Sequence, residues 1–174
     1  SNVDFVIRSL MRGEVDEPRL IRGVEITHVT PEKISKLARK ARELGAEIIV
    51  VHGETIVEPV IHGTNSAALI CEDVDMLAHP GIISAEDAER AKENDIFLEI
   101  TSRYGHCLTN GHIAKVCEEV GSPIIFSTDA HSPKDLVTQD EARRILEGSG
   151  LTPRRAKEVL TRNAERIVRK LEKK

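Results

Sequence analysis

Residues that can bind a metal ion recur at similar places along the chain. Each follows, or ends, a short apolar or β-branched stretch: Glu25, His52, His79, Glu99 and the pair Asp129 and His131. Neutral imidazole and carboxylate groups are ligands that Zn²⁺, Mn²⁺ and Fe²⁺ accept from proteins. A single histidine in such a place is more often a hydrogen-bonded structural residue, but five chain segments that agree predict one shared metal site.

The individual residues suggest different roles in that site. Asp129 and His131 are alternate residues, so both can face a metal, or one can face a metal and the other a substrate. Glu25 can bridge two metals because a carboxylate offers two oxygens. For Glu99 two roles stay open: direct ligation, or acceptance of a hydrogen bond that orients a ligating histidine.

A loop at residues 101–106 adds candidates for substrate binding. Its Arg103 has a guanidinium that could clamp a phosphate with two hydrogen bonds, although it could equally be a solvated loop charge. His106 in the same loop, and more weakly His28 and His62, are candidates for the same region, whereas His112 falls inside a predicted helix and is expected to be structural. No glycine-rich nucleotide-binding motif occurs in the sequence.

The elements that position these residues follow a strand-then-helix pattern. Strands are predicted at residues 24–29, 47–52, 74–79, 96–100 and 123–128, with helices at 30–44, 64–71, 84–94, 109–121, 135–147, 152–160 and 162–171. Such alternation is typical of parallel strands in an α/β domain. The C-terminal ends of parallel strands lie at the same end of the sheet, and in a barrel they converge on one mouth. A site to which every strand contributes a residue therefore favours a barrel over an open sheet.

Composition limits the class of protein. The 174 residues, 40% of them hydrophobic, suit one compact domain. The net charge is −4, and no run of five like charges occurs, so we expect no nucleic-acid partner. No targeting segment or apolar run of membrane-spanning length is present, which predicts a cytoplasmic protein without a membrane partner. Three cysteines without a paired motif are expected to be free thiols.

In five segments the chain resembles the polymerase and histidinol phosphatase (PHP) superfamily, especially its stand-alone phosphoesterases. The segments are residues 22–28 (RGVEITH), 50–55 (VVHGET), 77–81 (LAHPG), 97–101 (FLEIT) and 127–132 (STDAHS). The resemblance implies a single PHP-like domain over residues 1–174, folded as a distorted (β/α)7 TIM-like barrel that lacks its first one or two strands. It also implies two or three divalent metal ions (Zn, Mn or Fe).

The resemblance assigns roles to the candidate residues. Glu25 is similar to the bridging carboxylate, His52 and His79 to ligands of one metal, and Asp129 and His131 to the closing ligands. Catalysis would then depend on Glu25, His52 and Asp129. Arg103, with His106 and His28, is similar to the contact with the substrate phosphate.

The resemblance fails at the N-terminus. The superfamily begins with a strand that ends in a D-x-H-x-H motif, and residues 1–22 contain no histidine. They predict instead a short helix at residues 4–11 and a connector at residues 13–20. We expect the missing motif to belong to a preceding part of the protein, because an incomplete barrel would leave strand edges unprotected.

The leading functional hypothesis is therefore a metal-dependent phosphatase. Its substrate would be a small phosphorylated metabolite such as histidinol phosphate, attacked by a metal-bound hydroxide. Two alternatives stay open: a non-catalytic, barrel-shaped subunit of an RNA–protein complex of the ribonuclease P type, and a metal hydrolase of C–N bonds. The sequence does not indicate the oligomeric state.

Overall fold

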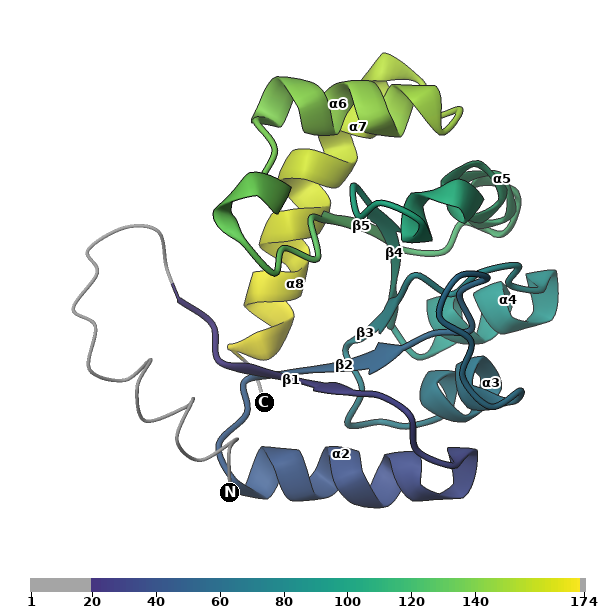
Figure 1. Ribbon diagram of the computed structural model, residues 1–174, viewed down its shortest axis with the longest axis vertical. Coiled ribbons are helices and arrows are strands. Elements are labelled where there is room, and N and C mark those ends of the chain that lie inside the picture. Colours follow the sequence, from purple (N-terminus) through teal and green to yellow (C-terminus); the bar gives the residue numbers. More distant parts are fainter. Residues whose placement is uncertain (1–19, 173–174) are drawn as a thin grey trace.

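Five parallel strands form one sheet, in the order in which they occur along the chain (Figure 1). The computed structural model describes residues 20–172. The strands are β1 (Gly23–Ile26), β2 (Ile48–His52), β3 (Met76–Ala78), β4 (Phe97–Thr101) and β5 (Ile124–Ser127). Each strand pairs in parallel with the next. The prediction of a parallel α/β fold is confirmed.

Helices cover both faces of this sheet. One side is covered by the helices that connect consecutive strands: α2 (Ile34–Glu43), α3 (Thr64–Leu69), α4 (Ala85–Glu93) and α5 (Asn110–Val120). The C-terminal helix α8 (Ala164–Leu171) lies against the other side (Figure 1). The central strands β3 and β4 are buried on both sides, whereas β1 stays partly exposed.

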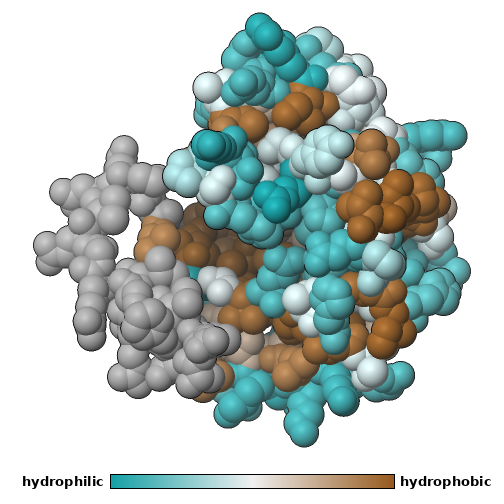
Figure 2. Space-filling model, viewed as in Figure 1, coloured by the Kyte–Doolittle hydropathy of each residue, from teal (hydrophilic) through white to brown (hydrophobic). Residues whose placement is uncertain are grey.

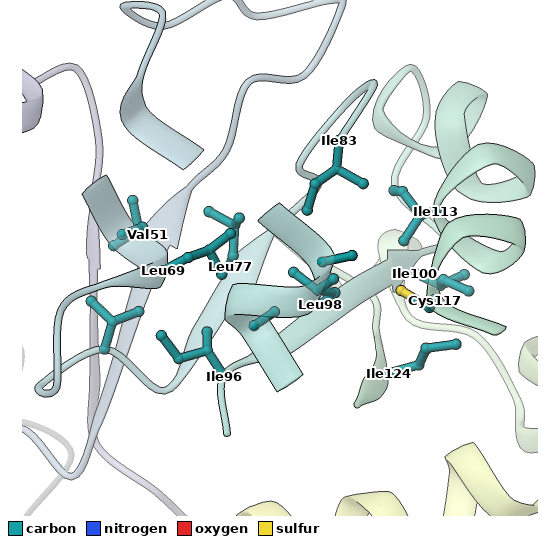
Figure 3. Packing of buried hydrophobic residues seen from close by; sticks show 14 of the residues in the cluster. Val51, Leu69, Leu77, Ile83, Ile96, Leu98, Ile100, Ile113, Cys117 and Ile124 are labelled. Atoms are coloured by element: carbon teal, nitrogen blue, oxygen red, sulfur yellow. The ribbon is translucent and has the colours of Figure 1, made fainter. Parts of the chain in front are cut away.

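Alternate residues of β2, β3, β4 and β5 divide between two apolar clusters. Leu98 and Ile100 of β4 point toward the connecting helices and pack near Ile113 and Cys117 of α5 (Figure 3). Phe97 points the other way and belongs to the smaller cluster with Ile167 of α8. This period of two is the side-chain alternation that a pleated strand imposes.

The helix starts differ in detail from the sequence prediction. The helix predicted at residues 135–147 begins instead at Gln139, in α6 (Gln139–Gly148), because Thr138 and Glu141 form a capping box there. The segment before it makes a separate turn, η3 (Pro133–Asp135). Ser84 caps α4 by accepting a hydrogen bond from the Asp87 backbone, as its sequence predicts.

The last two predicted helices are joined into one. Helix α7 (Pro153–Glu158) continues through a π-helical turn, η4 (Val159–Asn163), into α8. The buried side chain of Asn163 donates a hydrogen bond of 2.8 Å to the carbonyl of Ile124 in β5. It thereby satisfies a backbone group on the outer edge of the sheet.

The predicted barrel is not seen as a closed structure. Within residues 20–172 the sheet runs from β1 to β5 and no ladder joins these two edge strands. The helix predicted at residues 4–11 lies outside the described residues, as does the connector apart from residue 20. None of the helices in the described part of the chain combines the length and apolar character needed to cross a membrane.

Candidate functional site

The parallel sheet brings most of the predicted site residues to one edge. Glu25 and Glu99 lie within β1 and β4, near their C-terminal ends, and His52 is the last residue of β2. His79 and Asp129 follow β3 and β5 directly or within two residues. These side chains therefore lie together at the C-terminal ends of the strands, as the parallel topology predicts.

His79 is fixed by the buried carboxylate of Glu99. One oxygen of Glu99 accepts hydrogen bonds from the His79 backbone at 2.7 Å and from its Nδ1 at 2.9 Å. The other oxygen accepts from the Ser127 hydroxyl. Because Nδ1 of His79 donates to the carboxylate, its Nε2 carries a lone pair that points toward Glu25 and His52. Of the two roles left open for Glu99, the structure shows the orienting contact.

His52 and Glu25 form an ion pair beside that lone pair. Nδ1 of His52 lies 2.9 Å from Nε2 of His79 and 3.3 Å from Glu25. Its Nε2 lies 3.3 Å from the carbonyl of Glu58, which can only accept. His52 thus donates from both ring nitrogens, which requires the charged imidazolium.

The pKa directions agree with this ion pair. Burial opposes charge on His52, but hydrogen bonds to Glu25 and to the Glu58 carbonyl raise its pKa overall. Burial also opposes charge on Glu25, but the hydrogen bond from His52 and the charge of that ring lower the pKa of this carboxyl overall. The Nδ1 proton of His52 therefore lies between Glu25 and His79. Without that proton, all three side chains could offer lone pairs to one cation.

A second group of ligand-type side chains shares His79. The rings of His79 and His106 stack with centroids 4.1 Å apart, and Thr55 Oγ1 lies 2.9 Å from Nδ1 of His106. Burial and the neighbouring His79 lower the pKa of His106. Within residues 20–172, two groups of ligand-type side chains have ligand atoms within 4.8 Å of one another. One is formed by these two histidines with Asp129, and the other by Glu25, His52 and His79.

Arg103 occupies one ring nitrogen of His131, which lies beside Asp129 of the second group. Its Nη2 lies 2.9 Å from Nδ1 of His131, and a guanidinium can only donate. The remaining nitrogen of His131 then carries a proton and faces Asp129 at 3.3 Å. Arg103 also contacts Asp135 at 3.3 Å. In this arrangement His131 offers no lone pair to a cation, unlike the closing ligand that the sequence predicts.

Two other histidines of the sequence prediction lie at the margin. His28 is exposed, and its ring centroid is 6.0 Å from that of His52. His62 is exposed and contacts Glu54 at 3.0 Å. His112, expected to be structural, makes a hydrogen bond of 2.7 Å with the carbonyl of Ile83.

The backbone is strained at this edge of the sheet. Four residues other than glycine have positive φ in the described part of the chain: His28, His79, Asp95 and Asp129. Asp95 directly follows the C-terminal cap of α4, where this conformation is common. The other three lie at the candidate site, and such strain clusters at functional sites.

Two glycines allow the loops behind the site to pack backbone against backbone. A Cβ on Gly81, whose φ is +67°, would lie 1.9 Å from the carbonyl oxygen of Glu54. A Cβ on Gly53 would lie 2.5 Å from the carbonyl oxygen of Ala78. Thr55 and Glu58 lie on these loops, against His106 and His52, and are not among the predicted site residues. Their position shortly after a strand-ending histidine was the only available signal.

The donor set fits a divalent cation. Glu25, His52 and His79 offer one oxygen and two nitrogens, and Glu99 already fixes the orientation of His79. The proton on His52 would have to leave as the cation binds, because a ligating histidine must be neutral.

The fold and this edge site define a parallel α/β protein with a histidine and carboxylate cluster at the C-terminal ends of its strands. No family model matches the chain. It is 49% identical over 156 residues to the uncharacterized protein MJ1295 of Methanocaldococcus jannaschii, which covers 90% of the chain and 72% of that protein. The chain belongs to the family of MJ1295.

Other similarities are more distant. The chain is 26% identical over 166 residues to ribonuclease P protein component 3 of Methanosarcina mazei, covering 87% of the chain and 66% of that protein. Its fold is similar to a chain in the cryo-EM structure of archaeal ribonuclease P with mature tRNA, with a TM-score of 0.77, 20% identity, and coverage of 97% of this chain and 76% of that one. It is also similar to an amidohydrolase, with a TM-score of 0.61, 14% identity and coverage of 95% and 45%.

These comparisons contradict the phosphatase hypothesis. Neither the sequence relatives nor the solved structures named above support membership of the PHP superfamily or a metal-dependent phosphoesterase with a small phosphorylated substrate. The expectation of no nucleic-acid partner is also contradicted, because one sequence relative and one solved structure of similar fold both come from ribonuclease P. Strand-end histidines and carboxylates are compatible with more than one function on this fold.

Proposed function

We propose that the chain is a non-catalytic protein subunit of an RNA–protein complex of the ribonuclease P type. The fold match to a chain of archaeal ribonuclease P, over 97% of the residues, carries this proposal. The sequence similarity to component 3 of Methanosarcina mazei supports it independently. The consecutive strand order and the shared edge site further support a barrel in which these five strands form part of the wall.

The distribution of charge supports an RNA partner better than the net charge does. Residues 153–174 carry nine basic and three acidic residues, although the whole chain has a net charge of −4. A protein with such segregated charge can present a basic surface to phosphates while the rest stays acidic.

Exposed apolar side chains support a protein partner in the same complex. Several lie on the loops that follow β2, β3 and β4: Ile56, Val57, Ile82, Tyr104 and Leu108. Figure 2 shows brown patches over the loops in front of α3, α4 and α5. Exposed apolar side chains that lie in a group often mark an interaction surface, whereas single scattered ones are common on any protein.

The test is binding to RNA. We expect the purified chain to shift the ribonuclease P RNA of Methanocaldococcus jannaschii in a gel at concentrations that leave its antisense strand unbound. Affinity should fall steeply with salt. The same protein, loaded with Zn²⁺ or Mn²⁺, should not hydrolyse p-nitrophenyl phosphate. Equal binding to both RNAs, or no binding, would contradict the proposal.

We also propose that Glu25, His52 and His79 bind at least one divalent cation, of which Zn²⁺, Mn²⁺ and Fe²⁺ suit the donors. The oriented lone pair of His79 Nε2 favours this second proposal. Dialysis against each metal followed by elemental analysis should show bound metal in the wild type and in His62→Ala, a variant of the exposed histidine. His79→Ala should lose it. Equal metal content in all three proteins would refute the site.

A further inference from the structure

A small basic hollow lies on the surface of the C-terminal helical segment. It spans about 260 Å³ and is lined by residues of α7 and of the π-helical turn that follows: Arg154, Lys157, Glu158, Thr161 and Arg162. It belongs neither to the cluster at the strand ends nor to the exposed apolar loops. Its only acidic residue, Glu158, is neutralised by Arg155 at 3.2 Å.

The three cations of the hollow differ from their neighbours in having no ion-pair partner among residues 20–172. Arg155 pairs with Glu118, Arg166 with Asp95, and Arg169 with Glu165. Arg154, Lys157 and Arg162 are exposed, and they make no such contact with the described residues. An anion can therefore approach them without displacing an acidic side chain.

The π-helical turn helps to place these cations together. In an uninterrupted α-helix, with 3.6 residues per turn, Arg162 would be rotated by about 80° from Arg154. The wider π turn over Val159–Asn163 accommodates an extra residue, and Arg162 lines the same hollow as Arg154 and Lys157. The turn is held by buried Val159 and by the hydrogen bond from Asn163 to β5.

The surroundings favour a sugar–phosphate backbone over a protein surface as the occupant. From residue 153 to residue 172 no large apolar side chain is exposed, whereas the loops at the strand ends expose several. Protein interfaces need an apolar centre, and contacts to nucleic-acid backbones need mainly Arg and Lys.

We propose that Arg154, Lys157 and Arg162 contact the phosphate backbone of the RNA in the complex. This inference rests on the proposed function and names the surface that would contact the RNA. The contacts would be independent of RNA sequence and would position the subunit rather than select a base.

The experiment compares two triple variants of the full chain. In the first, Arg154, Lys157 and Arg162 are all changed to Ala. In the control, the same is done with Lys36, Arg39 and Lys40 of α2, whose hollow also contains Glu32 and Glu43. Alanine favours helix at all six positions, and far-UV circular dichroism verifies folding.

The readout is the affinity for the ribonuclease P RNA of Methanocaldococcus jannaschii from 50 to 300 mM salt. Three lost phosphate contacts should reduce the slope of log K against log salt by about 2 to 3, and the affinity at 0.1 M salt by on the order of 10²-fold. The α2 variant should keep the wild-type slope.

Each other outcome has a separate meaning. If the wild type binds RNA and the first variant keeps its slope, this inference is wrong while the proposed function stands. If both triple variants lose the slope equally, the effect reflects overall charge and the hollow is not the site. If the wild type does not bind RNA, the proposed function fails as well. Loss of a co-purifying protein partner with unchanged RNA binding would assign the hollow to an acidic protein surface instead.

Discussion

The contact between Glu99 and His79 gives the sharpest test of how the strand-end cluster is held. Glu99→Ala removes a buried acceptor and leaves the His79 backbone N–H and its Nδ1–H without a partner. Each unsatisfied buried donor costs about 1–3 kcal/mol, so we expect a loss of about 3–6 kcal/mol once the packing of the side chain is included. This is a large part of the 5–15 kcal/mol that stabilises a typical domain.

Glu99→Gln separates hydrogen bonding from charge. The amide oxygen can accept from both donors of His79, and the amide nitrogen can donate to the hydroxyl of Ser127. Only the additional strength of a charged acceptor is lost, which is about 1–2 kcal/mol. The metal affinity of the cluster should nevertheless fall about 10- to 100-fold, because the carboxylate that supports His79 has gone.

Urea denaturation followed by far-UV circular dichroism measures both variants. Glu86→Ala is the control, since Glu86 is 74% exposed and its ion pair with Arg90 contributes at most about 0.5 kcal/mol. The reasoning is refuted if Glu99→Ala and Glu99→Gln have the same free energy of unfolding within about 0.5 kcal/mol.

Two further predictions concern parts of the fold outside the cluster. Gly81→Ala should prevent folding or lower the free energy of unfolding by more than about 3 kcal/mol, because its Cβ would meet a backbone oxygen at 1.9 Å. Gly150 has φ +99° and no atom within 4 Å of such a Cβ, so Gly150→Ala should cost only the backbone strain of about 1 kcal/mol. Equal urea midpoints for the two would contradict the close packing of the loops. Burial raises the pKa of the Cys117 thiol to about 12, so at pH 8 a disulfide reagent should modify half-buried Cys107 in the native protein and Cys117 only after unfolding. Mass spectrometry of the modified peptides decides this point, and fast native modification of Cys117 would show that this part of the core opens readily.

The element pattern was predictable because the central strands are buried on both faces. Continuous apolar runs such as residues 47–52 are typical of that setting, and all five predicted strands are present within a few residues. The starts of helices were harder to predict. A capping box at Thr138 competes with the similar signal at Ser132, and only tertiary packing selects where α6 begins.

The gathering of the site residues was also predictable, since it follows from parallel topology alone. The partners of each side chain were not. The spacing of Asp129 and His131 allows both to face a metal. In the structure His131 contacts Arg103, whereas Asp129 lies near His79 and His106. Such choices depend on loop conformations, including the positive φ of Asp129, that no local pattern encodes.

The proposed RNA partner was not predicted from the sequence because net charge averages over the whole chain. Acidic residues elsewhere cancel the basic excess of residues 153–174, so the sum of −4 conceals a surface of opposite sign. That Arg154, Lys157 and Arg162 have no ion-pair partner within residues 20–172 depends on which neighbours reach them, and this is a property of the folded helices.

The arrangement around Arg103 agrees with the proposed role as a non-catalytic subunit. Hydrolysis by a metal-bound hydroxide needs several ligands and a group free to meet the substrate phosphate. Among residues 20–172, Arg103 is instead engaged by His131 and Asp135, and His131 presents no lone pair. What is left is a compact donor group around His79, tied to β1, β2 and β4 through Glu25, His52 and Glu99. A cation bound there would connect three strand ends and stiffen the loops that carry the exposed apolar side chains. A protein partner would then meet these side chains in a fixed arrangement.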